Sequence, residues 1–120
     1  MSVLVSVRRK TNSGRMPTLV EGSTSTYILY SAYPYNFFPR ESHQVATDLK
    51  IIIPPGYIGI LSQPETRNRF WPLKVMGSPL IRSNETKHVE IDIHNLANKF
   101  WKMAKGAAVA QLTIVPCFTG

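Results

Sequence analysis

The stretch Val45-Ala-Thr-Asp-Leu-Lys-Ile-Ile-Ile-Pro-Pro-Gly-Tyr-Ile-Gly59 decides the fold of this chain. Alternate residues from Val45 to Ile53 are apolar or β-branched, which predicts a strand with one buried face. Asp48 falls on the opposite face, where a solvated side chain is expected. Pro54-Pro-Gly56 predicts a tight reversal, because proline fixes φ and glycine accepts a positive φ. A second strand, Tyr57 to Leu61, is expected to follow the turn.

The same period of two recurs in other parts of the sequence, which predicts more strands. Nine prolines lie between these short runs, as in an all-β barrel or sandwich. One segment favours a helix instead of a strand, because Leu96, Phe100 and Met103 have helical spacing and Gly106 follows as a helix stop. The further expected strands are Ser2–Arg8, Tyr27–Tyr30, Val89–Ile93 and Ala107–Val115.

Composition limits the classes of protein to which the chain can belong. With 120 residues, 43% of them hydrophobic, it is expected to form a single β domain over residues 1–120. Cys117 is the only cysteine, which excludes an intrachain disulfide. The net charge of +7 favours acidic protein surfaces, nucleic acid or anionic membrane as partners. His43, His88 and His94 lack the tight spacing of a metal site, so no metal and no cofactor are expected.

Four segments of the sequence share the pattern of one known family. They are Thr26-Tyr-Ile-Leu-Tyr-Ser-Ala-Tyr-Pro-Tyr35, the stretch from Val45 to Gly59, Val89-Glu-Ile-Asp-Ile-His-Asn95 and Gly106-Ala-Ala-Val-Ala-Gln-Leu112. Together they resemble segments of the trimeric dUTPases. It covers nearly the whole chain. It implies a dUTPase-like distorted jelly roll or β-barrel of the β-clip type, and a homotrimer whose subunits share each active site. In that family, magnesium holds the nucleotide phosphates.

The residues that such an enzyme needs are replaced in this sequence. The resemblance implies an aspartate after Tyr27, where Ile28 stands, and an aspartate and an arginine after Gly106, where Ala107 and Ala108 stand. The arginine-serine-glycine motif is replaced by the run from Gln63 to Arg69. The run from Met76 to Glu85 lacks the catalytic aspartate and the tyrosine, and no glycine-rich tail follows. Without these groups the rate of hydrolysis is expected to collapse.

These replacements lead to the prediction of a non-enzyme without catalytic residues. The nearest likeness is to the dUTPase-derived, non-enzymatic proteins of adenoviruses, supported by the runs from Glu21 to Ile28 and from Pro55 to Gly59. The predicted role is a minor capsid component that binds viral capsid proteins as a trimer. It would be found in the virion, or in the host nucleus or cytoplasm before assembly. The alternatives are an adaptor for host signalling proteins and a residual dUTP diphosphatase.

Basic and aromatic residues are the candidate partner contacts. Arg67-Asn-Arg-Phe-Trp71 and Lys99-Phe-Trp-Lys102 mix cations with aromatic rings, as single-strand nucleic-acid sites do. The favoured interpretation is that these rings are buried at a barrel edge, so nucleic acid is a disfavoured partner. No membrane contact is expected. The candidates are Arg8, Arg9, Lys10, Arg67, Arg69, Trp71 and Lys102.

The family resemblance favours a hairpin over a helix between residues 89 and 103. Asn95-Leu-Ala-Asn98 suits a short connection, after which a strand from Lys99 to Met103 would return beside Val89–Ile93. Neighbouring residues of a strand face opposite ways, so either Phe100 or Trp101 is expected to point inward.

Overall fold

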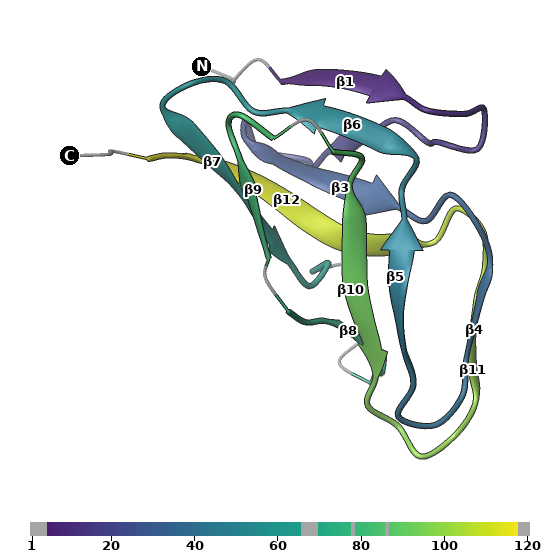
Figure 1. The fold of residues 1–120 in the computed structure, drawn as a ribbon. Coiled ribbons are helices and arrows are strands. Elements are labelled where there is room, and N and C mark those ends of the chain that lie inside the picture. Colours follow the sequence, from purple (N-terminus) through teal and green to yellow (C-terminus); the bar gives the residue numbers. More distant parts are fainter. Residues whose placement is uncertain (1–4, 66–69, 78, 86, 118–120) are drawn as a thin grey trace.

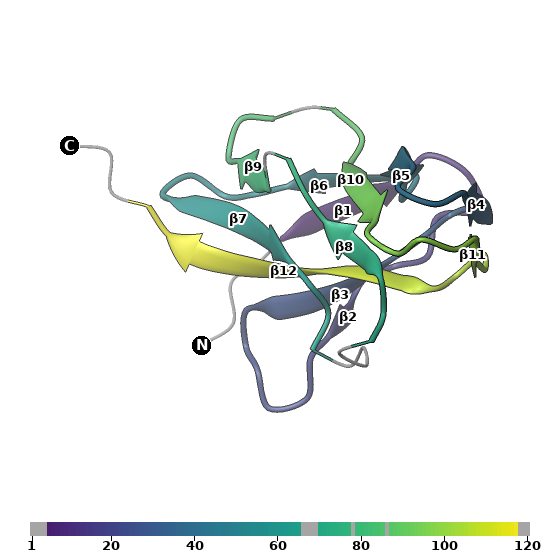
Figure 2. The same cartoon turned by 90° about the horizontal axis from the view of Figure 1, so that it is seen from below.

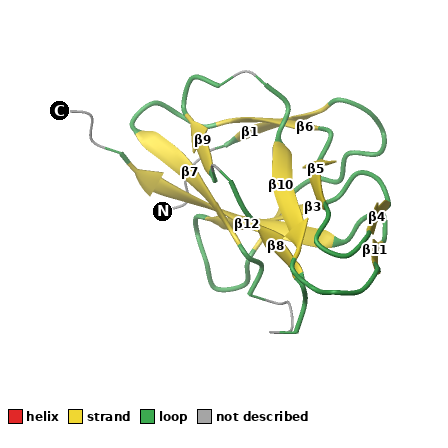
Figure 3. Cartoon of the chain, turned by 60° about the horizontal axis from the view of Figure 1, so that its bottom comes forward, coloured by secondary structure: helices red, strands yellow, loops and turns green. Residues whose placement is uncertain are grey.

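Strands account for all the regular secondary structure of the described chain. The computed structural model describes residues 5–65, 70–77, 79–85 and 87–117. Figure 3 shows strands joined by loops and turns, which confirms the all-β prediction. None of the described residues forms a helix long and apolar enough to cross a membrane. The strands are β1 (Ser6–Arg9), β2 (Thr18–Leu19), β3 (Thr26–Tyr30), β4 (Tyr35–Phe37), β5 (Ser42–Ala46), β6 (Leu49–Ile52), β7 (Tyr57–Ser62), β8 (Leu73–Val75), β9 (Leu80–Arg82), β10 (Glu90–Asn95), β11 (Trp101–Met103) and β12 (Ala108–Pro116).

The largest sheet has the strand order β2-β3-β12-β7-β9. Strand β12 lies between β3 and β7 and pairs antiparallel with both, as Figure 2 shows. A second sheet has the order β5-β10-β8, and two ribbons pair β1 with β6 and β11 with β4. Figure 1 places the β4–β11 ribbon at the side of the molecule beyond β5 and β10. All described strand pairs are antiparallel, as expected for a distorted jelly roll.

One continuous apolar cluster fills the space between these sheets and ribbons. The face predicted from the alternating run is confirmed, since Val45, Leu49, Ile51 and Ile53 are all at most 1% exposed. Strand β12 contributes to the same cluster through its own buried residues. Fully burying an aliphatic side chain of this size stabilises a fold by about 1.5–3 kcal/mol. The alternating pattern therefore identifies residues that belong to the hydrophobic core.

The predicted strand from Val45 to Ile53 is interrupted in the middle. Strand β5 ends at Ala46 and β6 begins at Leu49, and between them Asp48 has a φ of 52° in the left-handed region. Aspartate is one of the few residues with a side chain that tolerate this region. The prediction that Asp48 lies on a solvated strand face is therefore wrong, because its side chain is buried. This change of direction lets β5 pair with β10 while β6 pairs with β1.

The segment after β10 is a strand, but it pairs with a different neighbour from the one predicted. Strand β11 pairs with β4, with Trp101 opposite Phe37, and does not return beside β10. The helical alternative is excluded for this segment, and the predicted hairpin is wrong in its partner. The expectation about side-chain direction is confirmed, because Trp101 packs against the core whereas Phe100 is 47% exposed.

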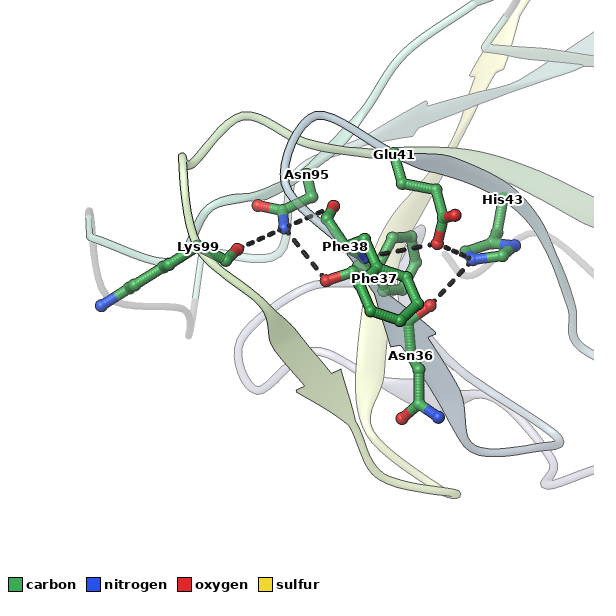
Figure 4. Close-up of polar contacts among 7 residues, drawn as sticks. All are labelled: Asn36, Phe37, Phe38, Glu41, His43, Asn95 and Lys99. Carbon is green, nitrogen blue, oxygen red and sulfur yellow. Dashed lines mark hydrogen bonds and ion pairs between the residues drawn. The ribbon is translucent and has the colours of Figure 1, made fainter.

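A buried asparagine fixes the chain where β10 ends. The side-chain nitrogen of Asn95 donates to the carbonyl oxygens of Phe37, Phe38 and Lys99 at 3.3, 3.1 and 2.9 Å (Figure 4). Its Oδ1 accepts the Ala97 amide hydrogen at 3.0 Å. Because buried carbonyl groups need donors, this one side chain replaces the hydrogen bonds that a regular turn would make. It explains why the chain turns toward β4 here.

We expect Asn95→Leu to lower the free energy of unfolding by about 2–3 kcal/mol, because one buried and two part-buried carbonyl groups lose their donor. Urea unfolding monitored by tryptophan fluorescence measures the change. Asn36→Ala is the matched control, since Asn36 is exposed and no hydrogen bond involves its side chain among those seen in the described residues. Equal stability of Asn95→Leu and the wild-type protein would contradict this role.

Candidate functional site

Three segments that are far apart in the sequence meet at the middle of β12. In the strand register, Gln111 lies opposite Ile28 of β3 on one side and Ser62 of β7 on the other. These strands carry three of the stretches through which the sequence resembles dUTPases. We therefore take the crossing of β3, β7 and β12 as the candidate site.

Gln111 links this crossing to the loop that follows β7. Its side chain is 5% exposed, and its Oε1 accepts the backbone N–H of Glu65 at 2.7 Å. Gln63, which follows β7, ties the start of this loop to β8. Its Nε2 donates to the Leu73 carbonyl oxygen, and its Oε1 accepts a hydrogen bond from the Val75 N–H, both at 3.0 Å. Two buried or half-buried amide side chains thus fix where the loop leaves β7 and where it reaches β8.

The chemical groups at the crossing match the replacements seen in the sequence. Ile28 is 8% exposed, so an apolar side chain occupies the position where the resemblance implies a carboxylate. Ala107 and Ala108 are half-buried at the start of β12. Glu65 is an exposed carboxylate at this place, and Gln111 holds its backbone. The sequence analysis singled out neither Gln111 nor Glu65, because the hydrogen bond that joins them leaves no periodic signal.

The described side chains at this crossing do not form a complete magnesium site by themselves. Magnesium is bound by hard oxygen ligands, usually one or two carboxylates and substrate phosphates. Ile28 offers no oxygen, and the described residues contain no group of three histidine, cysteine or acidic side chains able to hold a metal ion. No step of the chemistry proposed below is therefore assigned to a metal.

Among the described carboxyl groups, Asp48 has the clearest shift of its pKa from the ordinary value. Burial alone would raise the pKa of Asp48, but hydrogen bonds from Thr11 and Tyr33, with Lys10 and His88 nearby, bring its pKa below the ordinary value. Thr11 Oγ1 donates to Asp48 Oδ2 at 2.6 Å, and the Tyr33 hydroxyl donates to the same oxygen. That bond raises the pKa of Tyr33. Asp48 thus remains ionised and anchors the loop after β1.

The described candidates for partner contacts come from several elements of the fold. Arg8 and Arg9 are exposed on β1, Lys10 follows them, and Lys102 is exposed on β11. Trp71 is half-buried, with its ring centroid 5.6 Å from that of Trp101 in an edge-to-face arrangement, as the buried-ring reading expects. These assignments stay predictions. Arg67 and Arg69 lie outside the described residues.

Comparison with known proteins shows the family. The sequence profile of the dUTPase family matches residues 12–119, and the chain therefore belongs to this family. It is 25% identical over 120 residues to the deoxyuridine 5'-triphosphate nucleotidohydrolase of Antonospora locustae, covering 100% of this chain and 83% of that protein. It is 26% identical over 108 residues to the enzyme of the same name from fowlpox virus, covering 90% and 74%.

Solved structures show the same fold. A mutant of the dUTPase of phage 80alpha superposes with a TM-score of 0.89 at 22% identity, over 100% of this chain and 87% of the phage protein. The dUTPase of the Staphylococcus aureus phage phi11 also gives a TM-score of 0.89 at 22% identity, over 98% and 92%. The dUTPase-like jelly roll predicted from the sequence is thus confirmed.

The predicted role as a non-enzymatic capsid component is contradicted by these relatives. All four curated relatives, including the human mitochondrial and mouse proteins, are named deoxyuridine 5'-triphosphate nucleotidohydrolases, and none is named a capsid component. The prediction inferred loss of activity from the replaced motif residues and the missing glycine-rich tail. The likeness to enzymes, by contrast, extends over the whole chain.

We expect Asp48→Asn to flatten the dependence of stability on acid pH. The folded pKa of Asp48 lies below its unfolded value, so its contribution is complete above about pH 4 and is lost as the pH falls through the folded pKa. Asparagine keeps the two acceptor bonds and tolerates the left-handed backbone, but it carries no charge. Urea midpoints between pH 2.5 and 7 measure the effect.

Thr11→Val serves as the matched variant, because it removes one of the two donors and keeps the side-chain volume. It is expected to show a pH dependence between those of the wild-type protein and Asp48→Asn. If the stability difference between wild type and Asp48→Asn were the same at every pH, the ionised carboxylate would not be what stabilises the loop.

Proposed function

We propose that this chain is a subunit of a deoxyuridine 5'-triphosphate nucleotidohydrolase. The observation that carries the proposal is the match to the family over residues 12–119, which spans all three strands of the crossing at Gln111. The identically named enzymes of Antonospora locustae and fowlpox virus support it. The net charge of +7 supports it further, because a basic protein attracts a triphosphate.

The reaction would join water to the α-phosphorus of dUTP and release dUMP and diphosphate. Such a reaction depends on positioning the water and the phosphates and on stabilising their charge. Since Ile28, Ala107 and Ala108 carry no charge, turnover depends on other groups of this chain. Glu65 is our candidate to accept the proton of the attacking water, because Gln111 fixes its backbone at the crossing and a carboxylate can act as a general base.

We expect the purified protein to release diphosphate from dUTP, and Glu65→Gln to lower kcat by about 10²-fold with little change in KM, because general bases contribute on this scale. A coupled assay for diphosphate measures both constants. Glu90→Gln is the matched control, since Glu90 is an exposed carboxylate on β10, which does not take part in the crossing. Absence of diphosphate release from folded protein would refute the proposal.

A homotrimer is part of this proposal. The family resemblance implies that three subunits share each site, and the TM-scores of 0.89 support a subunit of the same shape. Light scattering on the purified protein is expected to give three times the chain mass of 13.5 kDa at micromolar concentration. A mass equal to one chain would contradict it.

A viral origin also remains a proposal. The relatives include a fowlpox virus protein and the similar structures include phage proteins, which supports it. The likeness to adenoviral members rests on the short runs from Glu21 to Ile28 and from Pro55 to Gly59. Location in virus particles, or in the nucleus or cytoplasm of an infected cell, is the matching proposal, and immunoblotting of purified particles and cell fractions tests it.

A further inference from the structure

A groove of about 570 Å³ lies between the loop that follows β1 and the turn between β11 and β12. These two segments lie on the same side of the molecule, beside the β4–β11 ribbon (Figure 1). The size is within the range of about 300–1,000 Å³ that is typical of small-molecule sites. Its polar and charged lining consists of Arg9, Asn12, Ser13, Arg15, Ser31 and Lys105.

Direct contacts join the two walls of this groove. Arg15 Nη1 donates to the Gly106 carbonyl oxygen at 3.3 Å, and Lys105 Nζ donates to Ser13 Oγ at 3.4 Å. The Arg15 guanidinium carbon lies 3.7 Å from the centroid of the Tyr30 ring. Stacking on an aromatic ring holds a guanidinium in place while leaving the N–H groups at its edge able to donate.

The charge of the groove is not neutralised within the described part of the chain. Arg9, Arg15 and Lys105 are exposed, the bonds of Arg15 and Lys105 go to neutral oxygens, and no ion pair joins any of the three to a described carboxylate. Of the described residues that line the groove, none is acidic. The Asp48 carboxylate accepts hydrogen bonds from Thr11 and Tyr33 and does not line the groove.

The wall formed by the loop after β1 has a fixed shape. The Ser13 N–H donates to Thr11 Oγ1 at 3.1 Å, and the Gly14 N–H donates to the Thr11 carbonyl oxygen at 3.2 Å. Gly14 packs so closely on the strand break that a Cβ atom would lie 2.7 Å from the Asp48 carbonyl oxygen. A preformed site loses little conformational entropy when a ligand binds.

We propose that this groove binds the polyphosphate chain of a small molecule, as inorganic triphosphate or a nucleoside triphosphate. Three cations match the several charges of such a chain, and guanidinium groups bind phosphate oxygens through paired hydrogen bonds. Ser13, Asn12 and Ser31 add neutral hydrogen-bonding groups. The site is distinct from the crossing at Gln111, which does not line the groove, so the proposal goes beyond the proposed function.

Calorimetry with inorganic triphosphate at low salt tests the groove without any turnover. One binding event per chain is expected, and Arg15→Gln and Lys105→Gln are each expected to weaken it about tenfold, because a hydrogen bond to a charged group is lost. Arg8→Gln and Lys102→Gln are matched controls, since these exposed cations do not line the groove. They should change the dissociation constant less than threefold.

Amide chemical shifts locate the binding and separate this proposal from the proposed function. Triphosphate should shift the amide signals of Ser13, Gly14 and Gly106 in the wild-type protein and in Glu65→Gln alike. If only signals near Gln111 moved, or if all four charge variants weakened binding equally, the groove would not be the site. Adding dATP in place of inorganic triphosphate shows whether a nucleoside contributes.

Two further probes test the class of ligand. A hexaglutamate peptide and a twelve-nucleotide single-stranded DNA carry their negative charges along longer chains. Either one binding more tightly than triphosphate, with the same loss in Arg15→Gln and Lys105→Gln, would overturn the small polyphosphate and assign the groove to a macromolecule.

Discussion

Hydrogen bonding along both edges of β12 is the constraint on which the rest of the fold depends. This strand is the shared neighbour of β3 and β7, so it fixes their register against each other. Its inward residues close the apolar cluster, and Gln111 in its middle holds the loop after β7. A central strand has no free edge, so all these positions are set together. The core and the candidate site are therefore two consequences of one register.

Much of the fold could be predicted because a strand with one buried face has an apolar side chain at every second residue. The alternation from Val45 to Ile53 and from Val89 to Ile93 identified the inward faces correctly. The alternation of apolar residues does not reveal a local change of backbone direction, so the sequence did not predict the break at Asp48. The pairing of β11 with β4 was missed for a related reason: it depends on the buried side chain of Asn95, whose bonds join residues 57 and 58 positions apart.

The candidate site was harder to predict than the fold. Comparing motif positions pointed to Ile28, Ala107 and Ala108, but the inference of a non-enzyme took the activity to depend on the family's motif residues alone. Glu65 and Gln111 are joined by a bond between a backbone N–H and a side chain 46 residues away, which no spacing rule reveals. The basic groove was missed in the same way, because Arg15 and Lys105 come from distant loops and form no charge run.

The place of β12 in the sequence has a consequence for synthesis on the ribosome. Both of its neighbours emerge earlier, so β3 and β7 each expose an unpaired edge until residues 108–116 have left the exit tunnel. Unpaired edges recruit strands from other chains, and pairings between distant segments form slowly. The nascent chain therefore passes through a stage in which it is open to aggregation, and the late arrival of a single strand ends that stage.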